Sequence, residues 1–325
     1  MLMKNHFVLF LMLLSFSAAA QNLEWRTGIT DTSYNTMKDY RQNLKHYPFI
    51  KIVPDSITPA VKETRNLVYC RMGNRDLHVD IFQPAKRQKK ASAPILIVHG
   101  GGWRSGNRTQ HIPLAQHLAV LGYTCFTVEY RLSTEALYPA AINDLKSALK
   151  WMEANAGKFN IDKEKMTIMG FSAGGQLAAL AGVTSGLPIF DKGDCNSGFS
   201  GTVKAVIDID GTLSFIHPES SEFEKPSGGA SLWWIGYTQK ERYDIWKEAS
   251  PFTYAEQNRV PFLFLNSAVE RMHAGRDDFK KIMDKKGVYT EIISFPDTPH
   301  SFCLYRPWFD PMVANIDAFM KKVFK

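Results

Sequence analysis

The serine motif at residues 170–174 constrains the fold of this chain more than any other feature. A short apolar run at residues 166–169 leads into Gly-Phe-Ser-Ala-Gly, and a helix-forming stretch follows at residues 176–182. A serine between a strand and a helix in a G-x-S-x-G motif is typical of a nucleophile elbow. The turn is too sharp for side chains on both neighbours, which explains the flanking glycines. Ser172 is therefore the candidate nucleophile, and the following helix directs the positive end of its dipole toward it.

A second strand, at residues 95–98, leads into the motif His-Gly-Gly-Gly-Trp at residues 99–103. An oxyanion hole needs bare backbone N–H groups directed at one point, and glycine permits the required close approach. The expected donors are the N–H groups of Gly101, Gly102 and Ala173. The alternative is a phosphate-binding loop, but neither G-x-x-x-x-G-K-[ST] nor G-x-G-x-x-G follows this strand. The two glycine motifs together favour the oxyanion interpretation.

The candidate base is His300. Serine enzymes with this elbow carry an acid and then a histidine downstream of the serine. Residues 289–295 are predicted to form the last strand, and His300 lies in the loop after it. His217 and His273 also lie downstream of Ser172, but both precede that strand. His300 is therefore predicted to accept the proton of Ser172.

The acid is expected at the end of the preceding strand, residues 261–265, which places it at Glu270. A glutamate can accept the His Nδ1–H bond and stabilise the imidazolium. Asp277 and Asp278 are alternatives, although they also suit the first turn of a helix, where carboxylates are favoured. We predict Glu270, and the choice between Glu270 and Asp277 stays open.

With these residues the chain resembles the α/β-hydrolase superfamily, and within it the secreted bacterial carbohydrate esterases that carry the motif His-Gly-Gly-Gly-Trp. The resemblance spans roughly residues 65–323 and includes the run 270–277 and the tail 299–309. Glu270 departs from the aspartate that is commonest in the superfamily. The resemblance implies a serine esterase that needs no cofactor or metal, and it implies acetylxylan, feruloyl or pectin acetyl esters as substrates.

The order of predicted elements agrees with that fold. Residues 123–130 and 204–208 are predicted strands, and residues 139–156 form a helix with apolar positions on one face. Strands that alternate with helices indicate a mostly parallel sheet covered on both faces, with the site at the carboxyl ends of the strands. We expect one α/β domain over residues 65–325, preceded by a surface-wrapping segment at residues 21–64.

Residues 212–250 interrupt this alternation and are predicted to form a small cap over the site. Loops in such positions usually carry specificity, and aromatic rings suit the apolar faces of sugars. The alternative is that the tryptophans seal the cap to the core. The substrate-binding candidates are Trp103, Asp210, Trp233, Trp234 and Trp308.

The first 20 residues are predicted to be a signal peptide, cleaved near Ala20. Lys4 precedes an apolar run at residues 7–16 that is too short to span a membrane, and small residues follow at positions 18–20. We therefore expect an exported protein with no membrane contact after cleavage. Export permits a disulfide bond, but the pairing among four cysteines stays open. They are Cys70, Cys125, Cys195 and Cys303.

The formal net charge of +7 favours an anionic partner such as pectin only weakly, because the basic residues are scattered. No cluster carries a nucleic-acid-binding motif, so no nucleic-acid partner is expected. The expected partner is an acylated carbohydrate or a small ester, and the oligomeric state stays undetermined. The alternatives are a feruloyl or lipase-like esterase of small esters and, outside the enzymes, an inactive glycan-binding homologue.

Overall fold

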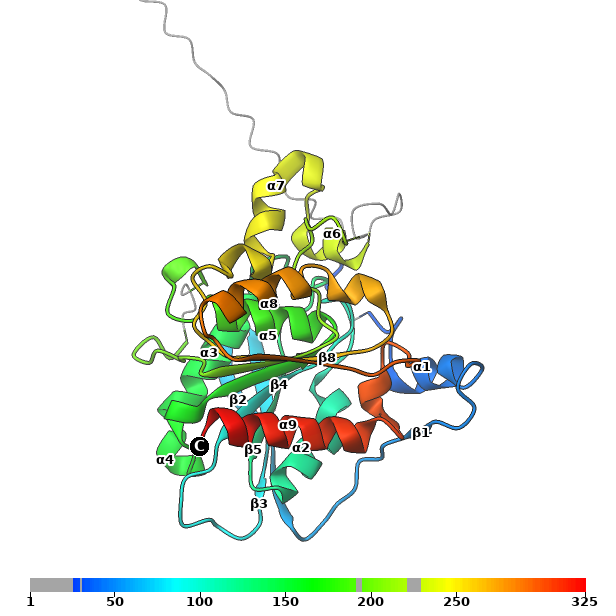
Figure 1. Ribbon diagram of the computed structural model, residues 1–325. Helices are drawn as coiled ribbons and strands as arrows, with labels where there is room; N and C mark the ends of the chain where they lie inside the picture. The colour runs from blue at the N-terminus through cyan, green and yellow to red at the C-terminus, as the bar shows by residue number, and fades with distance from the viewer. Residues whose placement is uncertain (1–25, 30, 191–194, 221–228) are drawn as a thin grey trace, which may run out of the picture.

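A computed structural model describes residues 26–29, 31–190, 195–220 and 229–325 of the chain (Figure 1). The predicted signal peptide lies outside these residues. Their main sheet has eight strands in the order β2-β3-β5-β4-β6-β7-β8-β9. The strands are β2 (Val61–Met72), β3 (Arg75–Pro84), β4 (Pro94–Val98), β5 (Thr124–Val128), β6 (Thr167–Phe171), β7 (Ala205–Ile209), β8 (Phe262–Asn266) and β9 (Thr290–Ser294).

The sheet is parallel from β5 to β9, and the hairpin β2–β3 adds two antiparallel strands at one edge. Every residue of β4, β6, β7 and β8 is buried. Strands buried on both faces read as continuous apolar runs, which is why their positions were visible in the sequence. The predicted α/β-hydrolase fold, with a mostly parallel central sheet, is confirmed.

Helices cover both faces of this sheet (Figure 1). One apolar core forms under α3, α5 and α8, and a second forms under α2 and α9. No helix in the described part of the chain is long and apolar enough to cross a membrane. The helices are α1 (Thr36–Asn43), α2 (Ile112–Val120), α3 (Ala140–Ala154), α4 (Ala156–Phe159), α5 (Ala173–Val183), α6 (Ala230–Ile235), α7 (Gln239–Glu248), α8 (Arg276–Lys285) and α9 (Phe309–Val323).

The segment before the sheet is attached to the rest of the molecule at several points. Asn35 begins α1, because its side chain accepts a hydrogen bond from the backbone N–H of Lys38 at 2.9 Å. Further on, β1 (Lys51–Ile52) pairs antiparallel with β10 (Tyr305–Arg306). This segment therefore packs against the part of the chain that carries the last loops.

The segment between β7 and β8 contains α6 and α7. Thr238 and Glu241 form a capping box at the start of α7. Trp234 and Trp246 are fully buried, and the Trp234 ring stacks on Trp103 at 4.9 Å between ring centroids. These two tryptophans therefore seal the inserted segment to the core, which is the alternative stated above for the aromatic residues of the cap.

A disulfide bond joins Cys70 in β2 to Cys195 after α5, across 125 residues. Cys125 and Cys303 are buried and unpaired. The sequence left this pairing open, because only the spatial proximity of β2 and the segment after α5 decides it.

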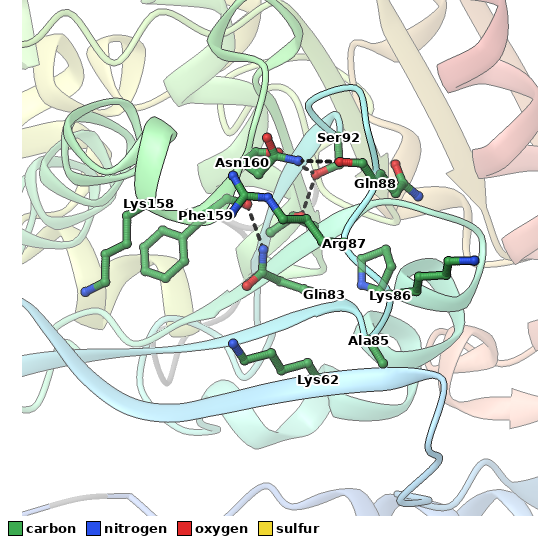
Figure 2. A pocket seen from close by; sticks show the side chains of 12 residues that line it. Lys62, Gln83, Ala85, Lys86, Arg87, Gln88, Ser92, Lys158, Phe159 and Asn160 are labelled. Atoms are coloured by element: carbon green, nitrogen blue, oxygen red, sulfur yellow. Dashed lines mark hydrogen bonds between the residues drawn. The ribbon is translucent and has the colours of Figure 1, made fainter.

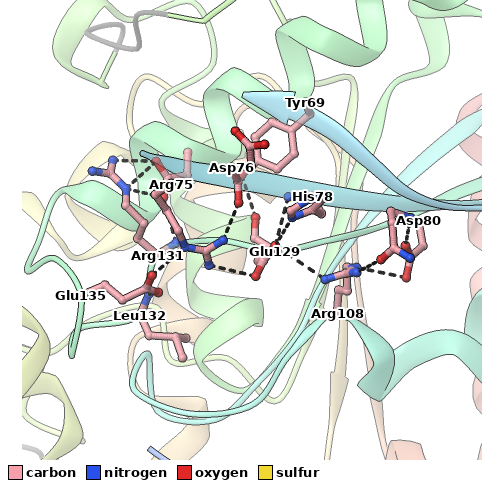
Figure 3. Close-up of polar contacts among 12 residues, drawn as sticks. Tyr69, Arg75, Asp76, His78, Asp80, Arg108, Glu129, Arg131, Leu132 and Glu135 are labelled. Atoms are coloured by element: carbon pink, nitrogen blue, oxygen red, sulfur yellow. Dashed lines mark hydrogen bonds and ion pairs between the residues drawn. The ribbon is translucent and has the colours of Figure 1, made fainter. Parts of the chain in front are cut away.

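A network of ion pairs lies where β5 ends (Figure 3). Glu129 follows β5 and pairs with Arg75 of β3 at 2.9 Å. Arg108, in the 3₁₀ turn Arg108–His111, lies 3.1 Å from Asp80 and 3.6 Å from Glu129. Burial alone would raise the pKa of Glu129, but its contacts with Arg75 and His78 hold that pKa below the ordinary value. The network thus anchors the loop after β4 to the edge of the sheet.

Candidate active site

The turn between β6 and α5 has the geometry of a nucleophile elbow. Ser172 has a φ of 56° and a ψ of −121°, a conformation that side-chain-bearing residues rarely adopt. A Cβ atom on Gly170 would lie 2.0 Å from the carbonyl oxygen of Gly174. One on Gly174 would lie 2.3 Å from the carbonyl oxygen of Val98. Glycine is therefore required on both sides of the serine.

His300 lies beside this serine, as the sequence predicted. Its Nε2 is 2.8 Å from the Ser172 Oγ atom. The loop after β9 carries His300, and the ring of Phe171 packs against the imidazole at 4.8 Å between centroids. The imidazole is thus held between the elbow and its own loop, in a position to take the serine proton.

The carboxylate that contacts His300 is Asp210, and the prediction of Glu270 is wrong. Asp210 Oδ2 lies 2.8 Å from His300 Nδ1. The Asp210 side chain is fully buried, and its Oδ1 accepts the backbone N–H of Ser267 at 2.8 Å. The Ser267 hydroxyl donates to Oδ2. Asp210 follows β7, so the acid comes from the strand next to β6 and not from β8.

The end of β8 serves a different purpose from the one predicted. Its last residue, Asn266, and the following Ser267 both donate hydrogen bonds to Asp210. Glu270 lies further on, in the 3₁₀ turn Glu270–His273, and is exposed. Asp277 and Asp278 stand in the first turn of α8, where they pair with Arg276 and Lys281 respectively. The two aspartates thus have the helix-terminal role that the sequence offered as the alternative.

A second buried carboxyl group, Asp208, lies two residues before Asp210. Its Oδ1 accepts the backbone N–H of Gly211 at 2.6 Å. Complete burial raises the pKa of Asp208 well above its ordinary value, and the neighbouring Asp210 raises it further. Burial thus disfavours a negative charge on Asp208, and the carboxyl group in contact with His300 is that of Asp210.

The loop after β4, residues 99–105 and here called the glycine loop, lies beside Ser172. Gly101, Gly102 and Ala173 line the same cavity as Ser172. Among the described residues, no backbone hydrogen bond is donated by the N–H of Gly101 or Gly102. Ala173 is the first residue of α5, so its N–H has no partner within the helix. Three N–H groups are thus available beside the nucleophile.

His99 holds this loop without taking part in proton transfer. Burial lowers the pKa of His99 to about 4, so the ring is neutral at pH 7. The ring stacks on Tyr130 at 4.4 Å, and the Tyr130 hydroxyl donates to the His99 carbonyl oxygen at 3.1 Å. The first residue of the motif is therefore structural.

The cavity at Ser172 has a volume of ≈ 330 Å³. Trp233 lines it, with the Arg104 guanidinium 4.8 Å from the centre of its ring. Trp103 also lines it, although its ring is largely buried and its Nε1 donates to Gln176 at 2.9 Å. Trp308 lies elsewhere, in contact with the rings of Tyr47 and Phe49. Of the predicted substrate-binding tryptophans, Trp233 is the best placed to meet a ligand.

Four cavity residues come from the segment before the sheet, which sequence reasoning did not include in the site. Apolar periodicity is weak there, so the sequence carried no signal that the segment approaches the serine. The four residues are Asp31, Ser33, Tyr34 and Asp39.

His111 is a buried histidine near the elbow, and its lowered pKa should make the stability of the protein depend on pH. It is 2% exposed, its ring meets Phe171 edge-on, and neither nitrogen has a hydrogen-bond partner in the described part of the chain. Burial lowers the pKa of His111 to about 3. Unfolding at pH 5 must therefore protonate this ring, so its contribution to stability is complete above about pH 6.5 and falls as the pH decreases toward 3.

We expect His111→Phe to make the free energy of unfolding less dependent on pH. Near pH 5 the slope should decrease by about 1.4 kcal/mol per pH unit, because one proton fewer is taken up on unfolding. Urea titrations of both proteins between pH 4.5 and 7.5 measure this slope. An unchanged slope would mean that His111 is already charged in the folded protein.

The fold and this arrangement define a protein of the α/β-hydrolase class with a Ser–His–Asp constellation. Residues 79–272 match the family model BD-FAE, and the chain belongs to that family. The probable carboxylic ester hydrolase LipM of Mycobacterium tuberculosis is 28% identical over 70% of this chain and 53% of its own length. The chain thus spans about half the length of the curated relatives it matches.

Solved structures show the same fold. A truncated carbohydrate esterase from gut microbiota superposes with a TM-score of 0.63 at 24% identity, over 81% of this chain and 96% of its own. Propionate-bound esterase Est2 of Thermogutta terrifontis gives a TM-score of 0.67 at 22% identity, over 82% and 95% of the two chains. At these identities the likeness establishes the architecture.

Proposed function

We propose that this protein is a carboxylic ester hydrolase that works through an acyl-enzyme on Ser172. The observation that carries the proposal is the continuous hydrogen-bond chain from Ser172 through His300 to Asp210. Ser172 also stands beside three backbone N–H groups that can donate hydrogen bonds to an oxyanion. The membership of the BD-FAE family and the similarity to a carboxylic ester hydrolase support it.

The proposed reaction has two halves. In the first, Ser172 Oγ attacks the ester carbonyl carbon while His300 Nε2 takes the serine proton, and the N–H groups stabilise the oxyanion. Asp210 holds the imidazole and stabilises its charged form. The tetrahedral intermediate then breaks its bond to the alcohol oxygen, to which His300 returns the proton. In the second half, water attacks the acyl-enzyme by the same route, releasing the acid and restoring Ser172.

The proposed substrates are short acyl esters, acetyl above all, on a carbohydrate of the plant cell wall such as xylan or pectin. The motif resemblance and the similarity in fold to a carbohydrate esterase support this choice. The small cavity supports it as well, because ≈ 330 Å³ must hold groups on both sides of the ester.

We expect kcat/KM for p-nitrophenyl acetate to exceed that for the octanoate by at least about tenfold. An acyl chain longer than the cavity must clash with its walls or distort to fit, which lowers kcat/KM. Its methylenes left in water supply none of the roughly 0.8 kcal/mol each, or roughly fourfold in kcat/KM, that burial would give to offset this loss. A series of p-nitrophenyl esters measures the preference, alongside acetate release from acetylated xylan and pectin. A feruloyl ester in the same series tests the aromatic alternative.

Trp233→Ala is the informative variant for this preference, because it removes a wall of the cavity and should shift the optimum toward longer chains. Tyr243→Ala, on α7 and exposed, is the matched control. A wild-type preference for octanoate, with no acetate released from either polymer, would indicate a lipase-like esterase instead.

We further infer that the protein is exported. The predicted signal peptide and the Cys70–Cys195 disulfide support this inference, because such bonds persist mainly in oxidising compartments. The mass of the protein recovered from the exported fraction of its host should correspond to a chain that begins at Gln21. A full-length mass in the cytoplasm would contradict it.

A further inference from the structure

The segment at residues 31–43, here called the N-terminal strap, connects the two loops that carry the reaction. At one end Asp31 pairs with Arg104 and forms a bridge with Ser105, both in the glycine loop. At the other end the Asn43 side chain donates to Ser301 Oγ at 3.2 Å, next to His300. The strap therefore runs along the cavity from the glycine loop to the loop that carries His300.

The middle of the strap lines the cavity with one hydrogen-bond donor and one acceptor. The Tyr34 hydroxyl accepts from Gln110 at 3.4 Å, and it donates no hydrogen bond within the described residues. Burial raises the pKa of Tyr34, and the nearby Asp39 raises it further, so the hydroxyl keeps its proton. That proton remains available to a ligand.

Asp39 supplies the acceptor. Its Oδ2 accepts from the Tyr305 hydroxyl and from Asn43 at 3.0 Å, which fixes the carboxylate in place. In the described part of the chain nothing donates to its Oδ1. A group that enters the cavity thus meets a phenol proton and a carboxylate oxygen on the same wall.

This wall belongs to the alcohol side of the ester. His300 must protonate the departing oxygen, so the alcohol leaves past the imidazole and the adjacent Ser301. Ser301 contacts the strap through Asn43. A sugar hydroxyl both donates and accepts, so it can satisfy Asp39 and Tyr34 together. The alkyl or aryl group of a simpler ester would exclude water from Asp39 and Tyr34 without forming a hydrogen bond to either. Burial of these polar groups without a partner is unfavourable.

We propose that the N-terminal strap forms the alcohol-side subsite of this enzyme, and that Tyr34 and Asp39 bind the hydroxyl groups of a sugar there. The inference rests on the proposed ester hydrolysis and adds the residues that bind the carbohydrate part of the ester. It also assigns a role in specificity to a segment that lies outside the matched family region, residues 79–272.

The test compares two acetyl esters that differ in the alcohol, an O-acetylated xylo-oligosaccharide and p-nitrophenyl acetate. For Tyr34→Phe and Asp39→Asn, the ratio of kcat/KM for the sugar ester to that for the aryl ester should fall by about tenfold. Tyr40→Phe is the matched control, because Tyr40 lies in α1, is not among the residues that line the cavity, and donates its hydroxyl to the Ile50 carbonyl oxygen. Asp310→Asn, exposed on α9, controls for loss of a carboxylate.

The possible results distinguish a failure of the proposed subsite from a failure of the proposed ester hydrolysis. If both esters slow equally in the two variants, the strap only holds the catalytic loops and the subsite is disproved. An unchanged ratio disproves it too, as does a wild-type enzyme that cleaves the aryl ester and not the sugar ester. Absence of any ester turnover would instead refute the proposed function. Calorimetric binding of the deacetylated oligosaccharide then decides the subsite separately, and weaker binding to Tyr34→Phe than to Tyr40→Phe supports it.

Discussion

Ser172→Ala should lower kcat for p-nitrophenyl acetate by a factor on the order of 10⁴ to 10⁶ while leaving the protein folded. The hydroxyl is the proposed nucleophile, and removal of one member of such a triad abolishes its concerted action. Among the described residues, the Ser172 side chain hydrogen-bonds with His300 alone, so its loss should change stability little. Steady-state kinetics and thermal unfolding of the variant measure both effects.

Ser147→Ala is a suitable control for this substitution. Its hydroxyl donates to the Asn143 carbonyl within α3, away from the site, so the same chemical change should leave kcat nearly unaltered. Near-normal turnover by a folded Ser172→Ala protein would contradict the serine mechanism.

Asp210→Asn should reduce kcat by about 10³- to 10⁴-fold, whereas Glu270→Gln should stay within about twofold of the wild type. An amide cannot stabilise the imidazolium, and it favours the wrong tautomer of His300. Asp210 is fully buried against His300 and Ser267, whereas Glu270 is exposed. The comparison of the two variants on one ester measures the difference directly.

Burial complicates the Asp210 variant, so its fold must be checked by circular dichroism and thermal unfolding. Ser267→Ala provides an intermediate case, since it removes one hydrogen bond to Asp210 and leaves the charge. A larger loss of activity in Glu270→Gln than in Asp210→Asn would return the role to the position predicted from the sequence.

The nucleophile and the histidine could be located from the sequence because local chemistry marks them. Ser172 lies between glycines that only a sharp turn requires, and His300 lies in the loop after the last strand. The positions of the central strands could be anticipated as well, because β4, β6, β7 and β8 are buried on both faces and are predominantly apolar.

The acid could not be chosen in the same way. The chain places polar groups after both β7 and β8, and each strand ends near the same edge of the sheet. Which carboxylate reaches His300 depends on lateral distance within the sheet and on the donors that Asn266 and Ser267 supply. A local sequence pattern indicates neither the distance between the strands nor the direction of these donors. The strap was missed for a similar reason, because its contacts with Arg104 and Ser301 join residues far apart in the chain.

The disulfide bond between Cys70 and Cys195 closes a covalent ring around part of the proposed machinery. The ring encloses the glycine loop and Ser172, whereas Asp210 and His300 lie on the chain that follows it. If the part after residue 195 detached from the sheet, the nucleophile would stay inside the closed ring and lose both partners. Loss of activity during partial unfolding would therefore report detachment of the carboxyl-terminal portion, while the ring remained intact until it was reduced.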